Sequence, residues 1–91
     1  MGFQETFKAL SDPTRRRVLD ILKTGGRTAG EIADQFGLTA ATVSHHLSVL
    51  RGAGLVDQDK RGKYISYELN MSVLDEIMGW VVSLKGGGED E

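Results

Sequence analysis

The hydrophobic periodicity of this chain changes twice, and these changes restrict the fold more than any other feature. In the first half the apolar residues recur at helical spacing, as Val43, Leu47 and Leu50 do at positions i, i+4 and i+7. Over 55–69 the segments become rich in Tyr, Ile and Val, and polar residues alternate with apolar ones, which favours β-strands. Helical spacing returns over 72–84. The sequence therefore predicts a mainly α fold with a β-hairpin before the last helix.

Helix-start and helix-stop signals separate the first two helices. Residues 3–10 are expected to form the first helix. Asp12 is a suitable N-cap for the second, because Pro13 then stands at the first helical position, where a missing N–H costs nothing. Gly25 follows this helix, and glycine tolerates the left-handed conformation that is common at helix ends.

The next two helices are predicted to form a helix-turn-helix. Thr28 and Glu31 have the spacing of a capping box, and Gly37 allows the turn a positive φ. Thr39 is the expected N-cap of the following helix, which covers residues 40–53.

A hairpin whose tip is residues 60–63 follows, and a helix-turn-helix with such a hairpin is a winged helix. The predicted order is four helices, two strands and a final helix capped by Asn70 or Ser72. We expect one domain, residues 1–85, that binds DNA and dimerises, because a chain of 91 residues has room for one core. Residues 86–91 are predicted to be a flexible acidic tail.

The second helix of the helix-turn-helix is expected to lie in the DNA major groove. Its outward face carries short polar and methyl-bearing side chains, which allow a close approach to bases. Ser and Thr can bond to either base type, and Ala or a Thr methyl can pack on the thymine methyl. An ordinary solvated helix face is the alternative. The predicted DNA contacts of this helix are Thr39, Ala41, Thr42, Ser44, His45 and Ser48.

Basic residues occur at two further places that could meet DNA. Lys60, Arg61 and Lys63 surround the hairpin tip, and we expect them to contact phosphate or the minor groove rather than only solvent. The run Arg15–Arg17 begins the second helix, where positive charge opposes the helix dipole. This run indicates either phosphate contact or ion pairs with acidic neighbours, and the sequence leaves both open.

The two histidines do not predict a metal site. His45 and His46 are adjacent, and neighbouring helical residues point about 100° apart, so the pair cannot chelate one ion. His46 flanks the inward face and suits a structural role, whereas His45 suits DNA. The chain has no cysteine, which excludes a thiolate metal site, a disulfide and a thiol switch. We therefore expect neither a metal nor another cofactor.

The last helix is apolar around much more than one stripe, so it is either buried on all sides or meets a partner. In so short a chain a partner is the better interpretation, and we expect a homodimer with two-fold symmetry. The predicted interface residues are Phe3, Phe7, Val73, Ile77, Trp80, Val81 and Leu84.

The net charge of −2 conceals an uneven distribution that matters for DNA binding. Residues 1–67 hold 10 basic and 7 acidic side chains, whereas residues 68–91 hold 1 basic and 6 acidic ones. The small positive excess predicts few phosphate contacts per subunit and an affinity that depends on dimerisation and on salt. No apolar run is long enough for a membrane span or a signal peptide, so we expect a cytoplasmic protein without membrane insertion.

Several motifs together resemble one family. Ser11-Asp12-Pro13-Thr14-Arg15, Val43-Ser44-His45-His46-Leu47 and Arg61-Gly62-Lys63 are similar to segments of the ArsR family of bacterial winged-helix repressors, in particular its short, metal-independent SdpR-like branch. The resemblance implies a homodimer formed through the first and last helices that represses transcription, often of its own operon. It places base reading on Thr42, Ser44 and His45, and the wing on Arg61 and Lys63.

The departures from the family concern the inducing signal. Metal-sensing members carry Cys-x-Cys in the third helix, where this chain has the segment 31–34, Glu-Ile-Ala-Asp. Other members bind zinc through Asp and His on the last helix, where this chain has Asp75 and Glu76 but no histidine. An inducer, if one acts, is then a protein or another small molecule.

We therefore predict a sequence-specific repressor whose dimer places two reading helices in successive major grooves, roughly 34 Å apart, on an inverted-repeat operator. The alternatives are a protein-interaction module, a metal sensor with unusual ligands, and an enzyme. The basic wing and the small-residue helix face disfavour the first of these. No acidic residue has the spacing of a catalytic triad with Ser44 and His45, so we do not expect an enzyme.

Overall fold

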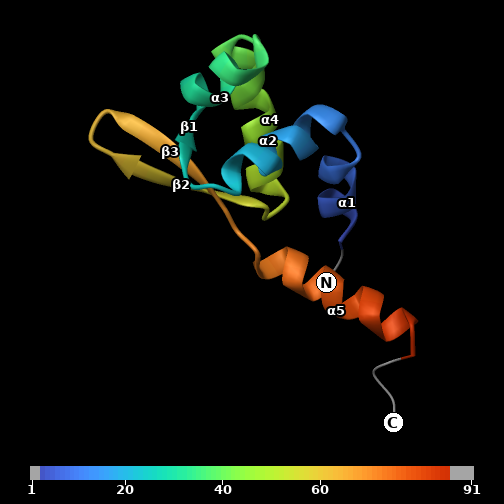
Figure 1. The fold of residues 1–91 in the computed structure, drawn as a ribbon. Coiled ribbons are helices and arrows are strands. Elements are labelled where there is room, and N and C mark those ends of the chain that lie inside the picture. Colours follow the sequence, from blue (N-terminus) through green and yellow to red (C-terminus); the bar gives the residue numbers. More distant parts are fainter. Residues whose placement is uncertain (1–2, 87–91) are drawn as a thin grey trace.

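The computed structural model describes residues 3–86, which form five helices and a three-stranded antiparallel sheet (Figure 1). The order confirms a mainly α winged helix-turn-helix with a hairpin wing. The elements are α1 (Gln4–Leu10), α2 (Pro13–Leu22), β1 (Arg27–Thr28), α3 (Ala29–Phe36), α4 (Ala40–Gly52), β2 (Val56–Arg61), β3 (Tyr64–Leu69) and α5 (Ser72–Leu84).

The short strand β1 corrects the predicted order, which had two strands. Arg27 and Thr28 pair with Tyr67 and Ser66 of β3, so the strand order in the sheet is β1-β3-β2. A Cβ atom on Gly26 would come within 2.7 Å of the Ser66 hydroxyl, so any larger residue there would force Ser66 to move. Two residues are too few to show an alternating pattern, and their pairing depends on a strand almost 40 positions later in the chain.

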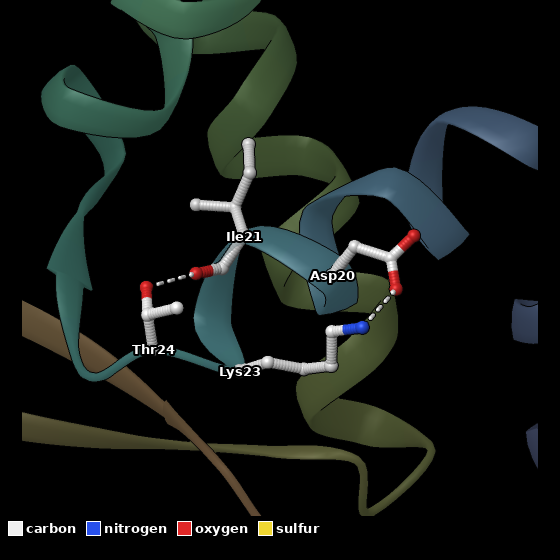
Figure 2. A network of polar contacts seen from close by, with 4 residues as sticks. All are labelled: Asp20, Ile21, Lys23 and Thr24. Atoms are coloured by element: carbon white, nitrogen blue, oxygen red, sulfur yellow. Dashed lines mark hydrogen bonds and ion pairs between the residues drawn. The ribbon is translucent and has the colours of Figure 1, made fainter.

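The turn between α2 and β1 is held by side chains. Figure 2 shows the Thr24 hydroxyl donating to the carbonyl of Ile21 at 3.2 Å and the ammonium of Lys23 at 3.5 Å from the Asp20 carboxylate. The ion pair is exposed and contributes little. The guanidinium of Arg27 donates to the same Thr24 hydroxyl at 2.9 Å. Thr24 therefore connects the end of α2 to the strand that follows.

The predicted caps of three helices are confirmed. Asp12 accepts a hydrogen bond from the backbone N–H of Arg15 at 2.9 Å, and this bond lowers the pKa of the Asp12 carboxyl below its ordinary value. Thr28 and Glu31 form both bonds of the capping box, at 2.9 and 3.1 Å. The hydroxyl of Thr39 accepts from the backbone N–H of Thr42 at 3.1 Å. These bonds satisfy N–H groups that a helix start leaves unpaired.

The start of α5 differs from the prediction. Neither Asn70 nor Ser72 is the N-cap, which is Met71, without a side-chain bond. Asn70 lies one residue earlier, where its side-chain amide oxygen, Oδ1, accepts from the N–H of Ser72 at 2.9 Å. Its amide nitrogen donates to both carboxylate oxygens of Asp57, at 3.2 and 3.1 Å. From the position before the N-cap, Asn70 therefore satisfies the first N–H of α5 and ties the beginning of the helix to β2.

The core lies where α2, α3 and α4 meet the base of the wing. Its largest completely buried side chains are Val18, Ile32, Val43, Leu47, Leu50, Leu55 and Val56. Helix α1 joins this core through Thr6 and Ala9, and the Thr6 hydroxyl donates to the buried carbonyl of Ala53 at 3.0 Å. The aromatic side chain of Phe7 points elsewhere and is 44% exposed.

Helix α5 projects from the rest of the fold (Figure 1), and Leu74 of its first turn packs against the core. Ile77 is its one buried residue. None of the helices over residues 3–86 is long and apolar enough to span a bilayer.

Candidate nucleic-acid interface

The turn before α4 directs this helix outward from α3. Gly37 has a φ of +68°, which glycine adopts without strain, and the N–H of Leu38 donates to the carbonyl of Ala33 at 3.2 Å. Thr39 then caps α4: its hydroxyl accepts from the N–H of Thr42 at 3.1 Å and donates to the Thr42 hydroxyl at 2.9 Å. The first turn of α4 is thus ordered before any ligand binds.

The outer face of α4 is exposed along its length. Val43, Leu47 and Leu50 are fully buried on the inner side, so the opposite side faces solvent. All six residues of the predicted reading face are exposed: Thr39, Ala41, Thr42, Ser44, His45 and Ser48. Because these side chains are short, the helix backbone could approach a DNA groove closely. Their contact with bases stays a prediction.

The arginine run makes contacts that neither sequence-based alternative described. The Nε atom of Arg15 donates to the carbonyl of Ala9 at 2.8 Å, and one of its terminal nitrogens lies 3.3 Å from the carbonyl oxygen of Lys8. Arg16 donates to the carbonyl of Leu10 at 2.6 Å. Two of these carbonyls, those of Ala9 and Leu10, lie in the last turn of α1, where a helix leaves its acceptors unpaired, whereas the Lys8 carbonyl also accepts from Ser11. Residue types alone do not reveal backbone acceptors, and so the sequence did not indicate this role.

Two further contacts of the run involve rings. The other terminal nitrogen of Arg15 lies 3.4 Å from Nδ1 of His46, which is half-buried on α4. Arg15 therefore connects α1, α2 and α4, and His46 has the structural position that its sequence context indicated. The guanidinium of Arg17 lies over the ring of Phe36, 4.5 Å from its centre, in a cation–π contact.

The wing carries an ion pair that sequence reasoning missed. The Nε of Arg61 donates to the carboxylate of Asp59 at 2.7 Å, and this bond raises the pKa of the arginine above its ordinary value. The two residues are two positions apart on one strand, so their side chains share a face. Lys60 and Lys63 are exposed and pair with no carboxylate of residues 3–86. The lysines thus supply the unneutralised charge of the wing.

The hairpin also exposes an aromatic residue that was not among the predicted contacts. Tyr64 lies opposite Arg61 in the strand register, and it is 69% exposed. Its phenol is a hydrogen-bond donor beside the basic tip. Residues paired across two antiparallel strands share a face of the sheet, so Tyr64 lies on the same face as Arg61. The register of the predicted hairpin could have indicated this.

The residues predicted for a dimer interface fall into three groups. Phe7, Trp80, Val81 and Leu84 are exposed, Phe3 and Val73 are half-buried, and Ile77 is buried within its own chain. The rings of Phe3, Phe7 and Trp80 form a row with centres 6.2 Å apart at each step, which joins α1 to α5. Met78 and Val82 of α5 are also exposed. Apolar surface gathered in this way marks an interaction site.

Over residues 3–86 no three His, Cys, Asp or Glu side chains come close enough to hold a metal ion together. The two acidic residues of α5, Asp75 and Glu76, are exposed.

Comparisons with known proteins agree with this geometry. Residues 10–59 match a family described as a helix-turn-helix domain. The transcriptional repressor SdpR of Bacillus subtilis strain 168 is 41% identical over 85 residues, which are 93% of this chain and 94% of that protein. An ArsR-like transcriptional regulator from Rhodococcus sp. RHA1 superposes with a TM-score of 0.86 at 26% identity, covering 92% of this chain and 77% of that one.

A second solved structure is informative about assembly. It is the homodimeric winged helix-turn-helix DNA-binding domain of a possible ArsR-family regulator from Mycobacterium bovis, with a TM-score of 0.75 and 25% identity over 96% of this chain and 81% of that one. An exposed helix beside a basic hairpin, on this fold, defines a winged helix-turn-helix regulator that binds DNA. The chain belongs to the ArsR family of transcriptional regulators.

Proposed function

We propose that this protein is a homodimeric, sequence-specific repressor of transcription, whose residues 1–85 both bind DNA and dimerise. The observation that carries the proposal is the exposed, small-residue face of α4 next to the basic wing. Repression is the role named for SdpR, which matches almost the whole chain. Of the proposed acidic tail, residues 86–91, only Gly86 lies within the described residues.

In the proposed complex the helix segment 39–53 lies in the major groove. Thr42, Ser44 and His45 hydrogen-bond to base edges, and the methyl of Ala41 packs on a thymine methyl. The wing, residues 60–63, contacts the backbone or the minor groove. Bound in this way the dimer blocks transcription by occupying the operator.

Dimerisation is supported by the exposed apolar surface of α1 and α5 and by the homodimeric Mycobacterium bovis relative. A two-fold axis would place two copies of α4 in major grooves roughly 34 Å apart, so we propose an operator that is an inverted repeat. The operator we propose lies upstream of the protein's own gene. No metal has a place in this mechanism, because ligand sets of the metal-sensing relatives are missing from the sequence.

A gel-shift experiment on the DNA upstream of the gene tests the proposal. We expect a discrete shift that survives competition by random-sequence duplex and is the same with added zinc and with a chelator. Sedimentation of the complex should give two chains per operator. Equal competition by operator and random duplex would contradict sequence-specific repression, and a zinc-dependent shift would contradict the metal-independent mechanism.

A further inference from the structure

A groove of about 440 Å³ lies between α1 and α4. His45 and Ser48, two of the predicted DNA contacts, belong to its α4 wall. Lys8 and Glu5 of α1 and Arg15 of α2 belong to the opposite wall. The groove therefore extends the proposed DNA-binding surface from α4 to α1, a helix that does not belong to the helix-turn-helix.

The charges in this groove favour an anion. The ammonium of Lys8 is exposed and is paired with no carboxylate of the part of the chain that the structure describes. Arg15 bonds to neutral carbonyl oxygens, and the nearby Asp12 carboxylate offsets part of its positive charge. Glu5 is the acidic residue of the lining. Among the lining residues the two cations outnumber the one carboxylate, and Lys8 is the cation that is free to meet an anion next to His45 and Ser48.

The position of the groove matches that of a DNA strand. The wing and α1 lie on opposite sides of α4 (Figure 1). A major groove is about 12 Å wide and is bordered by two phosphate backbones. When α4 lies in the major groove, the wing faces one of the two phosphate backbones, and the other backbone faces α1. A phosphate on that backbone would meet Lys8 and Arg15, which are the cations lining the groove.

We propose that this groove binds a backbone phosphate of the DNA, with Lys8 as the contact that DNA binding gains from α1. The inference deepens the proposed function and rests on it. Such a contact is independent of base sequence, because phosphates are the same at every position. It supplies affinity and fixes the helix in the groove, and it adds to the few cations that the wing leaves unneutralised.

The test uses paired substitutions and a random-sequence duplex, so that it does not depend on knowing the operator. Lys8→Gln should weaken binding about fivefold to tenfold per subunit near 0.1 M salt, and the salt slope of the dimer should fall by about 1.8. Glu5→Gln, in the same groove, should strengthen binding. Lys23→Gln removes one positive charge at the end of α2, away from the groove. It is the matched control, and we expect its affinity and salt slope to be unchanged.

The outcomes separate this inference from the proposed function. If the unmodified protein binds no duplex with salt-dependent affinity, the proposed function itself fails. If the unmodified protein binds but Lys8→Gln and Glu5→Gln both behave as Lys23→Gln does, the groove does not contact DNA. A Lys8→Gln variant that sediments as a monomer would assign Lys8 to the dimer instead. Inorganic phosphate that binds through Lys8 without any change in the DNA salt slope would assign the groove to a small anion.

Discussion

Helices α4 and α5 are both 13 residues long, but they differ in how they meet the rest of the molecule. Helix α4 buries three large apolar residues and exposes a polar side, whereas α5 buries Ile77 and exposes apolar residues on its other sides. A polar outer face can remain in water until DNA arrives. An apolar outer face of this extent is stabilised by a second protein surface. The contrast supports the proposal that α4 binds DNA and that α5 mediates self-association.

The largest expected effect tests the buried side of α4. Leu47 is completely buried, so Leu47→Ala should lower the free energy of unfolding by about 2–5 kcal/mol through lost burial and a residual cavity. Urea denaturation at several protein concentrations measures this loss, which should not depend on concentration. Val82→Ala on the exposed side of α5 is the control, and its effect should appear only where dimers form. If both variants lost the same free energy of unfolding at every protein concentration, the contrast between a buried side of α4 and an exposed side of α5 would be wrong.

The second effect tests the apolar side of α5. Trp80 contacts Phe7 of its own chain, and 46% of its surface is still exposed. In a dimer the partner chain can bury this exposed part. Trp80→Ala should weaken dimerisation by about 2 kcal/mol, which is about 30-fold in the dissociation constant, and operator binding should weaken with it. Analytical ultracentrifugation measures the constant. An intact dimer with unchanged affinity would show that Trp80 only covers α1 of its own chain.

The third effect distinguishes the helix from the wing. Ser44→Ala should cost about 1–3 kcal/mol on the operator and little on random duplex, because a base contact is lost. Lys63→Ala should weaken both DNAs alike and reduce the salt slope, because the exposed Lys63 is one of the wing cations that no carboxylate of the described residues neutralises and its phosphate contact is lost. Fluorescence titration over a range of salt concentrations measures both. Equal losses on the two DNAs for Ser44→Ala would remove this residue from the reading face.

The smallest effect tests the start of α4, which has a side-chain cap, unlike that of α5. Thr39→Ala should lower the free energy of unfolding by about 0.5–2 kcal/mol, because the N–H of Thr42 loses its acceptor. Thermal denaturation measures the change, and Thr39→Ser, which keeps a hydroxyl, should recover most of it. A melting temperature of Thr39→Ala equal to that of the unmodified protein would contradict the capping role.

The order of the elements could be predicted because its signals are local. Asp12, Thr28 and Thr39 lie within three residues of the N–H groups that they cap, and the change from helical to alternating spacing is visible in short windows. What was missed depends on residues far apart in the chain or on backbone atoms. The pairing of β1 with β3 is of this kind, as are the bonds from Arg15 to the end of α1.

The candidate site shows the same division. Exposure of the α4 face follows from one helix period, and it was predicted residue by residue. The neutralisation of Arg61 by Asp59 depends on rotamers across one strand face, and a count of basic residues at the tip does not reveal it. The burial of Ile77 depends on where α5 lies, which its own apolar pattern leaves undetermined.

The small strand β1 has a consequence for how this protein avoids aggregation. Because β3 is paired on both sides, β2 is the long strand that borders the sheet. An unpaired strand edge can add strands from other molecules, and charged side chains discourage this. Four of the six residues of β2 are charged: Asp57, Asp59, Lys60 and Arg61. These charges disfavour edge-to-edge association of the sheet, which leaves the apolar helices as the surface of the proposed dimer.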